Sequence, residues 1–272
     1  MEIRIETWDE GNLIVNAEYA DILKHNNILS AEKLWAINSE SVKNVVKDRG
    51  TERSYLEPLN GTDFIETYIK RYQPTNFSAV ISTMLSFKPA PLDAFGEWQA
   101  MLDFHKLGLS TLVPIAVGRS LSGTCNLTLG VKDYVRASAL LETLGAGDRA
   151  RKLELIDKIA RLVGGMHAAG FAHRDCYLLH FFVQPAINDA VCVIDLQRIV
   201  RELPLGRRWR VKDLAQLLFS AKGLVSRTDA TRFCRRYSEI TGTPLLRNKT
   251  LIRDIQEKAS SIYERERRKL RN

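Results

Sequence analysis

The hydrophobic and polar positions in the first half of the chain follow a pattern typical of β-strands. Residues 41–46 are compatible with a strand, residues 48–51 with a turn, and residues 53–56 with an extended continuation. Asn60-Gly61 is a strong hairpin signal. Aromatic and β-branched residues dominate the segment 64–72 that follows. These segments predict a three-stranded antiparallel meander.

A helix is predicted after the meander, over residues 93–106. Its apolar residues recur at helical spacing, and Gly108 follows them as a stop signal. Two strand-like segments come next, at residues 113–117 and 127–132. The first half therefore reads as a sheet with one long helix.

The second half is mostly helical in pattern. An apolar stripe between residues 155 and 166 predicts a long helix, with Asp148 as its N-cap and Gly170 as its end. Two more helices are predicted, and the last of them is long and amphipathic. They cover residues 211–221 and 250–269.

A small strand-rich part before a larger helical part is the coarse pattern of a two-lobed phosphotransferase. We therefore expect an α+β fold with two lobes. The sequence assigns residues 35–132 to an N-terminal lobe and residues 133–272 to a C-terminal lobe. Residues 1–34 are an N-terminal extension to which the sequence assigns no role.

The composition excludes several classes of protein. The chain has 272 residues, of which 45% are hydrophobic and 26% are charged, and this is the composition of a folded protein. Collagen, a disordered tail and a coiled coil do not describe it. No apolar run approaches the ~20 residues of a spanning helix, and the first residues show no secretory signal. Four scattered cysteines without a CxxC pair favour a reducing cytosol over a disulfide framework or a zinc site.

The net charge of +8 is concentrated in two segments. Residues 198–212 hold six bases and one acid, and residues 247–272 hold nine bases and four acids. Such segments indicate an anionic partner, either nucleic acid, an anionic membrane face or a phosphorylated substrate. A solvated helical face with a charged tail is the alternative. No zinc-finger spacing and no RNP-like aromatic motif occurs, so we expect no nucleic-acid partner.

The segment His173-Arg174-Asp175 matches the first three residues of the kinase catalytic loop. In that loop, H-R-D-L-x-x-x-N, the Asp accepts the proton of the substrate hydroxyl and the Asn holds a metal ion. His180 stands five residues after Asp175, where the Asn would be. The triplet follows the long predicted helix and precedes a strand-like run, which is the context that a kinase requires.

Asp195 ends that strand-like run, twenty residues after Asp175. A kinase places its Mg²⁺-binding aspartate here, because a divalent cation must neutralise the phosphates of the donor. The same chemistry requires a lysine on the third strand and a glutamate on the following helix. Lys70 and Glu97 stand in those positions. An aspartate in a turn and two ordinary surface residues are the alternative interpretation of these three positions.

A set of five segments is more specific than the H-R-D triplet alone. The segments are Gly96-Glu97-Trp98, Met166-His167-Ala168-Ala169-Gly170, His173-Arg174-Asp175-Cys176-Tyr177 with His180-Phe181, Ile194-Asp195-Leu196-Gln197-Arg198, and Arg207-Arg208-Trp209-Arg210-Val211-Lys212-Asp213-Leu214. Together they resemble the lipopolysaccharide core kinase family, the Kdo/heptose kinases of Gram-negative bacteria. The resemblance runs from about residue 41 to the C-terminus and is densest over residues 166–214.

The resemblance implies a protein-kinase-like fold and transfer of the γ-phosphoryl group of ATP to a sugar hydroxyl of the inner core, either heptose or Kdo. It implies Mg²⁺ as cofactor, ATP as co-substrate and the lipopolysaccharide core as acceptor. A cytoplasmic enzyme, held peripherally at the anionic inner membrane, would fit that acceptor.

The residue roles follow from the same resemblance. The catalytic group is Asp175 with Arg174 and His180, the metal ligand is Asp195, and the nucleotide contacts are Lys70 with Glu97. Asp213 is expected to brace the catalytic loop through backbone N–H groups. Independently of the resemblance, the basic segment suggests that Arg198, Arg207 and Arg208 border the acceptor side, where they could bind carboxylates or phosphates of the acceptor. A solvated basic loop is the alternative.

The chain departs from kinases in one respect, because no G-x-G-x-x-G occurs anywhere in it. The expected nucleotide loop holds only Gly50, with Arg49, Thr51 and Arg53 near it. Two alternatives therefore stay open. One is a kinase for another sugar, a small molecule or a protein, and the other is a catalytically inactive kinase-like binding module.

Overall fold

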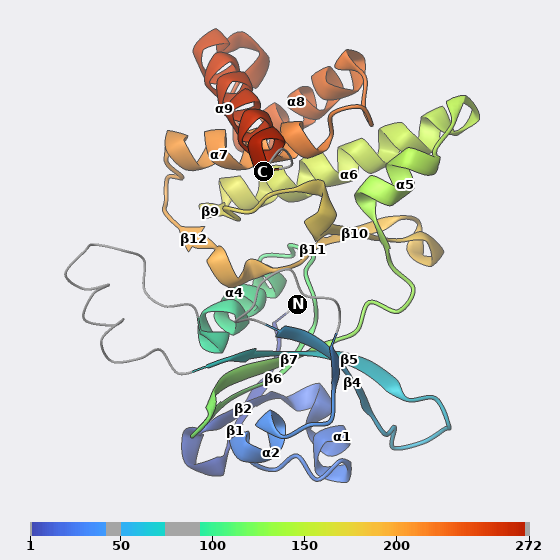
Figure 1. Cartoon of the computed structure of the whole chain (residues 1–272), viewed down its shortest axis with the longest axis vertical. Helices are drawn as coiled ribbons and strands as arrows, with labels where there is room; N and C mark the ends of the chain where they lie inside the picture. The colour runs from blue at the N-terminus through green and yellow to red at the C-terminus, as the bar shows by residue number, and fades with distance from the viewer. Residues whose placement is uncertain (1, 42–49, 74–92, 270–272) are drawn as a thin grey trace, which may run out of the picture. The chain divides into compact units, whose positions relative to one another are not determined.

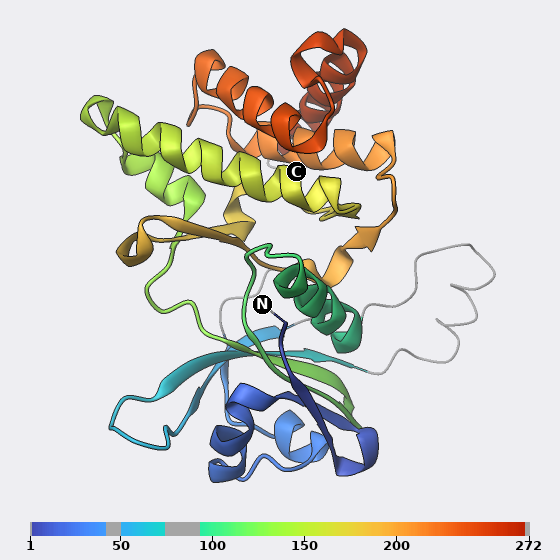
Figure 2. The same cartoon turned by 180° about the vertical axis from the view of Figure 1, so that it is seen from behind.

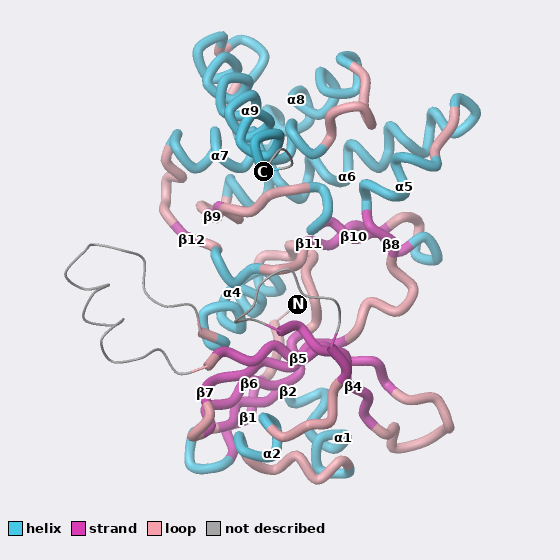
Figure 3. The backbone as a smooth tube through the Cα atoms, viewed as in Figure 1, coloured by secondary structure: helices cyan, strands magenta, loops and turns pink. Residues whose placement is uncertain are grey.

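The structure is a computed structural model that describes residues 2–41, 50–73 and 93–269. The chain forms two compact units, Met1–Lys132 and Asp133–Asn272. Most of the strand and turn predicted over residues 41–51, including Arg49, lies outside the described residues. The fold is α+β, with the long sheet in the first unit and the long helices in the second, as the sequence predicts (Figures 1 and 3).

The N-terminal unit contains a seven-stranded sheet in which every neighbouring pair is antiparallel. In sheet order the strands are β1 (Ile5–Trp8), β2 (Leu13–Asn16), β6 (Pro114–Ser120), β7 (Gly123–Leu129), β5 (Ile65–Tyr72), β4 (Gly50–Leu56) and β3 (Glu40–Ser41). The neighbours β3, β4 and β5 form the predicted meander. The first two strands come from the segment to which the sequence assigned no role, and they extend the sheet beyond β6.

Helices cover both faces of this sheet (Figures 1 and 2). The short helices α1 (Ala20–His25) and α2 (Ala31–Trp35) enclose the larger core, to which the sheet contributes alternating residues such as Ile69. The helix α4 (Ala94–Lys106) packs on β5, β6 and β7. Trp98 and Tyr72 belong to the smaller core on the α4 side.

The predicted helix at residues 93–106 is confirmed. Asp93 is its N-cap, and its carboxylate accepts the Gly96 N–H at 2.8 Å. That bond satisfies one of the N–H groups that have no partner in the first turn.

Within its described residues, 133–269, the C-terminal unit contains five helices and two small sheets (Figure 1). The helices are α5 (Ala137–Thr143), α6 (Arg149–Ala168), α7 (Arg207–Ser220), α8 (Arg227–Thr241) and α9 (Lys249–Lys269). One sheet has the order β11 (Ala190–Val193), β10 (Phe181–Gln184), β8 (Val135–Arg136), and the other pairs β12 (Val200–Arg201) with β9 (Phe171–Ala172). The contacts of α6 with α8 and of α7 with α9 dominate the packing between helices.

Seven short 3-10 turns connect the described elements. They are η1 (Asp9–Gly11), η2 (Ala17–Tyr19), η3 (Ala146–Asp148), η4 (Leu178–His180), η5 (Pro185–Ile187), η6 (Leu196–Arg198) and η7 (Leu245–Arg247). No helix in the described ranges is both long enough and apolar enough to cross a membrane.

One predicted helix start differs from the structure, and one predicted N-cap residue makes a different hydrogen bond. The helix predicted from residue 211 begins at Arg207. The prediction missed the first turn because that turn is polar and carries no hydrophobic periodicity. Asp148 does precede α6, but its side chain accepts the Gly145 N–H at 3.0 Å and makes no bond to the helix. It therefore closes the preceding turn.

Gly170 ends α6 with a backbone that only glycine adopts readily. Its φ is +83°, and a Cβ at this position would lie 2.7 Å from the carbonyl oxygen of Glu202. The same two residues pair, since the Glu202 N–H donates to the Gly170 carbonyl at 2.8 Å. This contact fixes the start of β9, which leads directly into His173-Arg174-Asp175.

Candidate active site

In the N-terminal unit, Lys70 and Glu97 form the ion pair that the sequence predicts. Lys70 Nζ lies 2.7 Å from Glu97 Oε1. Glu97 is only 4% exposed, and its second oxygen accepts from the Tyr72 hydroxyl at 2.9 Å and from the Asn126 amide at 3.0 Å. Three donors therefore hold one buried carboxylate, which compensates for its removal from water.

The register of β5 explains why Lys70 reaches Glu97. Successive side chains of a strand point to opposite faces, so Lys70 and Tyr72 share the face on which α4 packs. Asn126 is the Cα partner of Lys70 on β7, which brings it to the same place. The adjacent Arg71 points to the opposite face, where it donates to the carbonyls of Trp35 at 2.9 Å and Ile37 at 2.7 Å.

In the C-terminal unit, Asp213 on α7 binds backbone N–H groups of the loop that contains His173-Arg174-Asp175. Its side chain is fully buried, with Oδ2 accepting the His173 N–H at 2.7 Å and Oδ1 accepting the Arg174 N–H at 2.8 Å. His167 Nε2 lies 3.2 Å from Asp213 Oδ2, and His167 Nδ1 lies 2.9 Å from the Tyr237 hydroxyl oxygen. The predicted brace is therefore confirmed.

Two further α7 residues bind the same loop, and sequence reasoning missed both. Gln216 accepts the Cys176 N–H at 2.9 Å and donates to the Arg174 carbonyl at 3.0 Å. Ser220 accepts the Leu178 N–H at 2.9 Å. The spacing from Asp213 by three and seven residues places all of them on one helix face. That spacing was the available signal, but polar residues on a helix are common.

His173 adopts one tautomer and is fully buried. Its Nδ1 accepts the Asp175 N–H at 3.3 Å, so Nε2 carries the proton and donates to the Ile194 carbonyl at 2.9 Å. Burial lowers the pKa of His173 below its ordinary value of 6.5, although the Ile194 bond opposes the shift. The neutral ring thus links the catalytic loop to the residue before Asp195.

Asp175 faces an arginine that the sequence had placed on the acceptor side. Arg198 Nη1 lies 3.0 Å from Asp175 Oδ2 and 3.4 Å from Oδ1. Arg198 therefore orients the carboxylate of the expected catalytic residue. Arg174 itself has φ 69°, and its guanidinium carbon lies 5.3 Å from the centre of the Trp209 ring.

His180 and Asp195 lie close together. The Nδ1–H of His180 donates to the Asp175 carbonyl at 2.7 Å, which leaves Nε2 facing Asp195 Oδ2 at 3.7 Å. The side chains are 16% and 22% exposed, so both remain accessible to a ligand. A cation bound near both groups would stabilise this approach of an imidazole nitrogen to a carboxylate.

A magnesium ion fits one side of this pair better than the other. Among the described residues, no three His, Cys, Asp or Glu side chains converge on one point. Mg²⁺ in phosphoryl transfer needs only one or two carboxylates, since waters and substrate phosphates complete its shell. Asp195 suits that arrangement, whereas the imidazole of His180 is a poor ligand for a cation that prefers oxygen.

Comparison with known proteins identifies the family to which this arrangement belongs. Residues 32–237 match the profile of the lipopolysaccharide kinase (Kdo/WaaP) family. The chain belongs to this family. A lipopolysaccharide core heptose(I) kinase WaaP of Pseudomonas aeruginosa is 33% identical over 215 residues, which cover 74% of this chain and 80% of the relative. The WaaP of Escherichia coli K12 is 28% identical over 246 residues, which cover 83% of this chain and 89% of the relative.

A solved structure, described as WaaP in complex with acyl carrier protein, has the same fold with a TM-score of 0.70. It is 26% identical and covers 92% of this chain and 99% of the solved chain. As a member of the Kdo/WaaP family, this chain is a phosphotransferase, a lipopolysaccharide core kinase that acts on a sugar hydroxyl.

The two arginines that begin α7 in this Kdo/WaaP kinase differ in their surroundings. Arg207 is engaged by Asp254 of α9, with Nη2 and Oδ2 2.6 Å apart. The guanidinium carbon of Arg208 instead lies 4.4 Å from the centre of the Trp209 ring. Of the predicted acceptor-side set, Arg198 contacts Asp175, Arg207 contacts Asp254, and Arg208 contacts an aromatic ring.

Proposed function

We propose that this protein transfers the γ-phosphoryl group of ATP to a heptose hydroxyl of the lipopolysaccharide inner core. The observation that best supports the reaction is the loop at residues 173–178, whose backbone α7 holds by five hydrogen bonds while it presents Asp175. The choice of heptose over Kdo is supported by the names of the relatives in Pseudomonas aeruginosa and Escherichia coli.

In the proposed reaction, Asp175 binds the acceptor hydroxyl and takes its proton, while Arg198 keeps the carboxylate in position. Lys70, held by Glu97, contacts the phosphates of the nucleotide. Phosphoryl transfer depends on positioning and charge stabilisation more than on covalent catalysis. A network of preorganised side chains is therefore a suitable catalytic apparatus.

Asp195 is the proposed ligand of Mg²⁺. The bound ion would neutralise the charge that develops on the phosphates. His180 would orient the loop through its bond to the Asp175 carbonyl and leave its Nε2 beside Asp195. Arg174 acts through its backbone, since its N–H and carbonyl are both held by α7.

The test is transfer of labelled phosphate from ATP to deacylated core oligosaccharide from a strain that lacks this protein. We expect Asp175→Asn to lower kcat by about 10²–10⁴-fold, because the acceptor proton loses its base. Asp133→Asn, an exposed residue in the same unit, is the matched control. Mass spectrometry should find the added phosphate on heptose.

An inactive wild type with every acceptor, together with no ATP binding, would favour the inactive binding module. Activity only with another sugar or with a protein would favour the other alternative. The retained set of Lys70, Glu97, Asp175 and Asp195 argues against an inactive module, because these four residues supply the nucleotide-binding, proton-accepting and metal-binding groups of a kinase.

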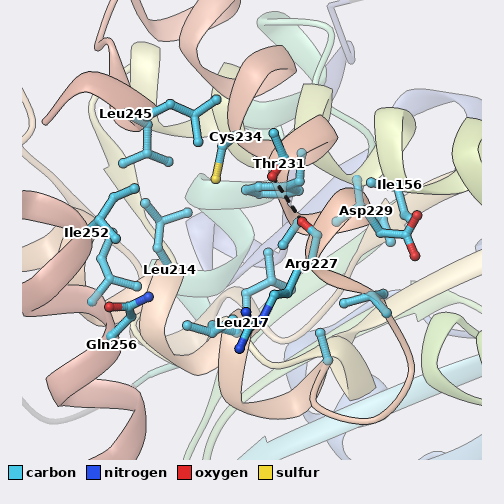
Figure 4. A pocket seen from close by; sticks show the side chains of 18 of the residues that line it. Ile156, Leu214, Leu217, Arg227, Asp229, Thr231, Cys234, Leu245, Ile252 and Gln256 are labelled. Atoms are coloured by element: carbon cyan, nitrogen blue, oxygen red, sulfur yellow. Dashed lines mark hydrogen bonds between the residues drawn. The ribbon is translucent and has the colours of Figure 1, made fainter. Parts of the chain in front are cut away.

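We further propose that the protein binds an acyl carrier protein through the acyl chain. The C-terminal unit contains a cavity of about 540 Å³, lined mainly by apolar side chains of α5 to α9 (Figure 4). Ile156, Leu217 and Ile252 contribute to its walls from three different helices. This volume lies in the range of small-molecule sites, and the similar solved structure contains an acyl carrier protein.

This partner can be tested by filling the cavity. Ala230 lines it on α8, so Ala230→Phe should block an acyl chain, whereas Thr228→Phe on the same helix is exposed and outside the lining. We expect the first variant to weaken binding of a long-chain acylated carrier protein by about tenfold or more. Equal binding by the two variants, or equal binding of the unacylated carrier, would contradict an acyl-chain site.

A peripheral position at the inner membrane is the last part of the proposal. The helix α9 buries four apolar residues against its own unit and exposes basic ones, among them Arg253, Arg267 and Arg268. Basic residues near an anionic surface contribute about 1 kcal/mol each. Co-sedimentation with anionic but not neutral vesicles, reversed by salt, would support this position.

A further inference from the structure

A second, smaller cavity lies between α7 and α9, and its wall is basic. It has a volume of about 230 Å³ and is lined by four cations, Arg208, Lys212, Lys258 and Arg265, together with Tyr177 and Trp209. None of the described residues that line it is acidic. We call this cavity the basic groove.

Three of the four cations form no ion pair with any acid in the described part of the chain. These are Arg208, Lys212 and Lys258, whereas Arg265 lies 3.4 Å from Glu266. Several exposed bases elsewhere on the same two helices are paired, as Arg207 is with Asp254 at 2.6 Å and Arg253 with Glu257 at 3.8 Å, whereas Lys249 and Arg267 form no ion pair with any described residue. The groove therefore concentrates positive charge that the protein leaves uncompensated.

The groove shares a wall with the catalytic loop. Tyr177 stands two residues after Asp175, and Gln216, which holds the loop at Cys176 and Arg174, also lines the groove. Lys212 precedes the brace Asp213 and is half-buried. Burial lowers the pKa of Lys212, as do Arg174 and Arg198, while Asp175 opposes the shift. An anion in the groove would relieve this crowding of cations.

We propose that the basic groove binds a carboxylate or phosphate group of the acceptor saccharide, on a unit next to the sugar that is phosphorylated. The inference rests on the proposed kinase function and adds the place in the fold where an acidic group of the acceptor binds. The volume is below the about 300–1,000 Å³ of drug-sized sites. It therefore suits one charged sugar unit, with the rest of the oligosaccharide outside.

Arginine and lysine around a pocket give strong, charge-assisted hydrogen bonds to either anion. Neither Arg208 nor Lys258 contacts Asp175, Asp195 or the residues that brace the loop through any ion pair or hydrogen bond in the described structure. Their removal should therefore weaken acceptor binding and leave the chemical step unchanged.

The experiment compares the double variant Arg208→Ala/Lys258→Ala with the wild type on deacylated core oligosaccharide. We expect KM for the acceptor to rise about tenfold or more, with kcat within about twofold, because only binding shared by ground and transition state is lost. KM for ATP should not change. Lys249→Ala is the matched control, since Lys249 is an exposed base of α9 that does not line the groove.

A chemically neutral acceptor gives the second comparison. When the carboxylates of the oligosaccharide are reduced and its phosphates are removed, wild type and double variant should have the same KM. A double variant that is indistinguishable from the wild type on the acidic acceptor would overturn the proposal. A difference that persists on the neutral acceptor would overturn it as well.

Direct binding separates this proposal from the proposed kinase function. If the wild type transfers no phosphate, isothermal titration with the acidic oligosaccharide decides the role of the groove, because binding that the double variant loses supports it. Binding that the double variant retains contradicts it. If the double variant loses affinity for anionic vesicles but keeps its acceptor KM, the groove binds lipid headgroups and the proposal is wrong.

Discussion

Glu97 and Asp213 are both buried carboxylates that position parts of the site, yet they do so through different partners. Glu97 is held by the side chains of Lys70, Tyr72 and Asn126. Asp213 accepts the backbone N–H groups of His173 and Arg174. Side chains can rotate when their partner changes, whereas a backbone N–H in a fixed loop cannot. The two acids should therefore tolerate amide substitution very differently.

The Asn126 side chain is the reason for this expected difference between the two acids. Its Nδ2 donates to Glu97, while its Oδ1 is buried and has no hydrogen-bond partner in the described structure. Rotation of the amide by half a turn would present that oxygen to a donor at position 97. The network around Glu97 thus contains a spare acceptor, whereas each oxygen of Asp213 faces a fixed backbone donor, and Oδ2 also lies 3.2 Å from His167 Nε2.

The largest effect is expected for Asp213→Asn. The new NH₂ group would face a backbone N–H, and a buried donor without an acceptor costs about 1–3 kcal/mol. The loss of the charge-assisted hydrogen bond to the carboxylate costs a similar amount. We expect an unfolding free energy lower by about 2–4 kcal/mol and a large loss of kcat. Denaturant unfolding followed together with phosphoryl transfer measures both. Unchanged stability would contradict the role of the brace.

Glu97→Gln should lose function with little loss of stability. Rotation of the Asn126 amide can satisfy the new NH₂ group, so we expect a change below about 1.5 kcal/mol in unfolding free energy. The ion pair with Lys70 is lost, and kcat/KM for ATP should fall by about tenfold or more. Removing the spare acceptor by Asn126→Ala should make the stability loss of Glu97→Gln larger. Strict additivity of the two substitutions would refute the rotation.

Gln216→Ala tests the second contact of α7 with the loop. It removes the bonds to the Cys176 N–H and the Arg174 carbonyl, and we expect a loss of about 1–2 kcal/mol. Hydrogen exchange at the Cys176 amide should speed up more than exchange at the Arg174 amide, which Asp213 still holds. Equal acceleration at both amides would mean that the loop opens as a unit.

The smallest expected effect is the contribution of His173 to the pH dependence of the unfolding free energy. Its pKa is lowered in the folded protein, so below about pH 6.5 the unfolded chain binds a proton that the folded chain does not. This histidine should therefore make the unfolding free energy fall as the pH falls, by at most about 1.4 kcal/mol per pH unit. Nuclear magnetic resonance of the His173 ring should give a midpoint below that of histidine in a short peptide. A midpoint above it would contradict the buried neutral ring.

The local sequence was sufficient to predict most of the helices and strands and to place Lys70 and Glu97 on two of them. The meander, the helix that contains Glu97 and the strand before Asp195 each have a periodicity or turn signal within a few residues. The first two strands were missed. They pair with each other, but only β2 joins them to the sheet, through β6, which comes about a hundred residues later in the chain. No pattern inside residues 5–16 specifies that pairing.

The partners of the site residues were decided by long-range packing. Arg198 was assigned to the acceptor from its place in a basic segment, yet it contacts Asp175, and Arg207 from the same segment contacts Asp254. The sign of a charge is a property of the sequence, whereas the carboxylate that neutralises it depends on which helix packs alongside. Only Arg208 of that set lies in the basic groove, and it does so because α7 packs against α9.

The sequence by itself determined which groups are available for the chemistry, since an H-R-D triplet, an aspartate after a strand and a lysine on a strand are local patterns. The tertiary structure decided how those groups are held. Tyr72, Asn126, Gln216 and Ser220 bind the site through contacts that are set by strand register and helix packing. A hydrogen bond depends on a distance of about 3 Å in space, and separation along the chain does not specify that distance.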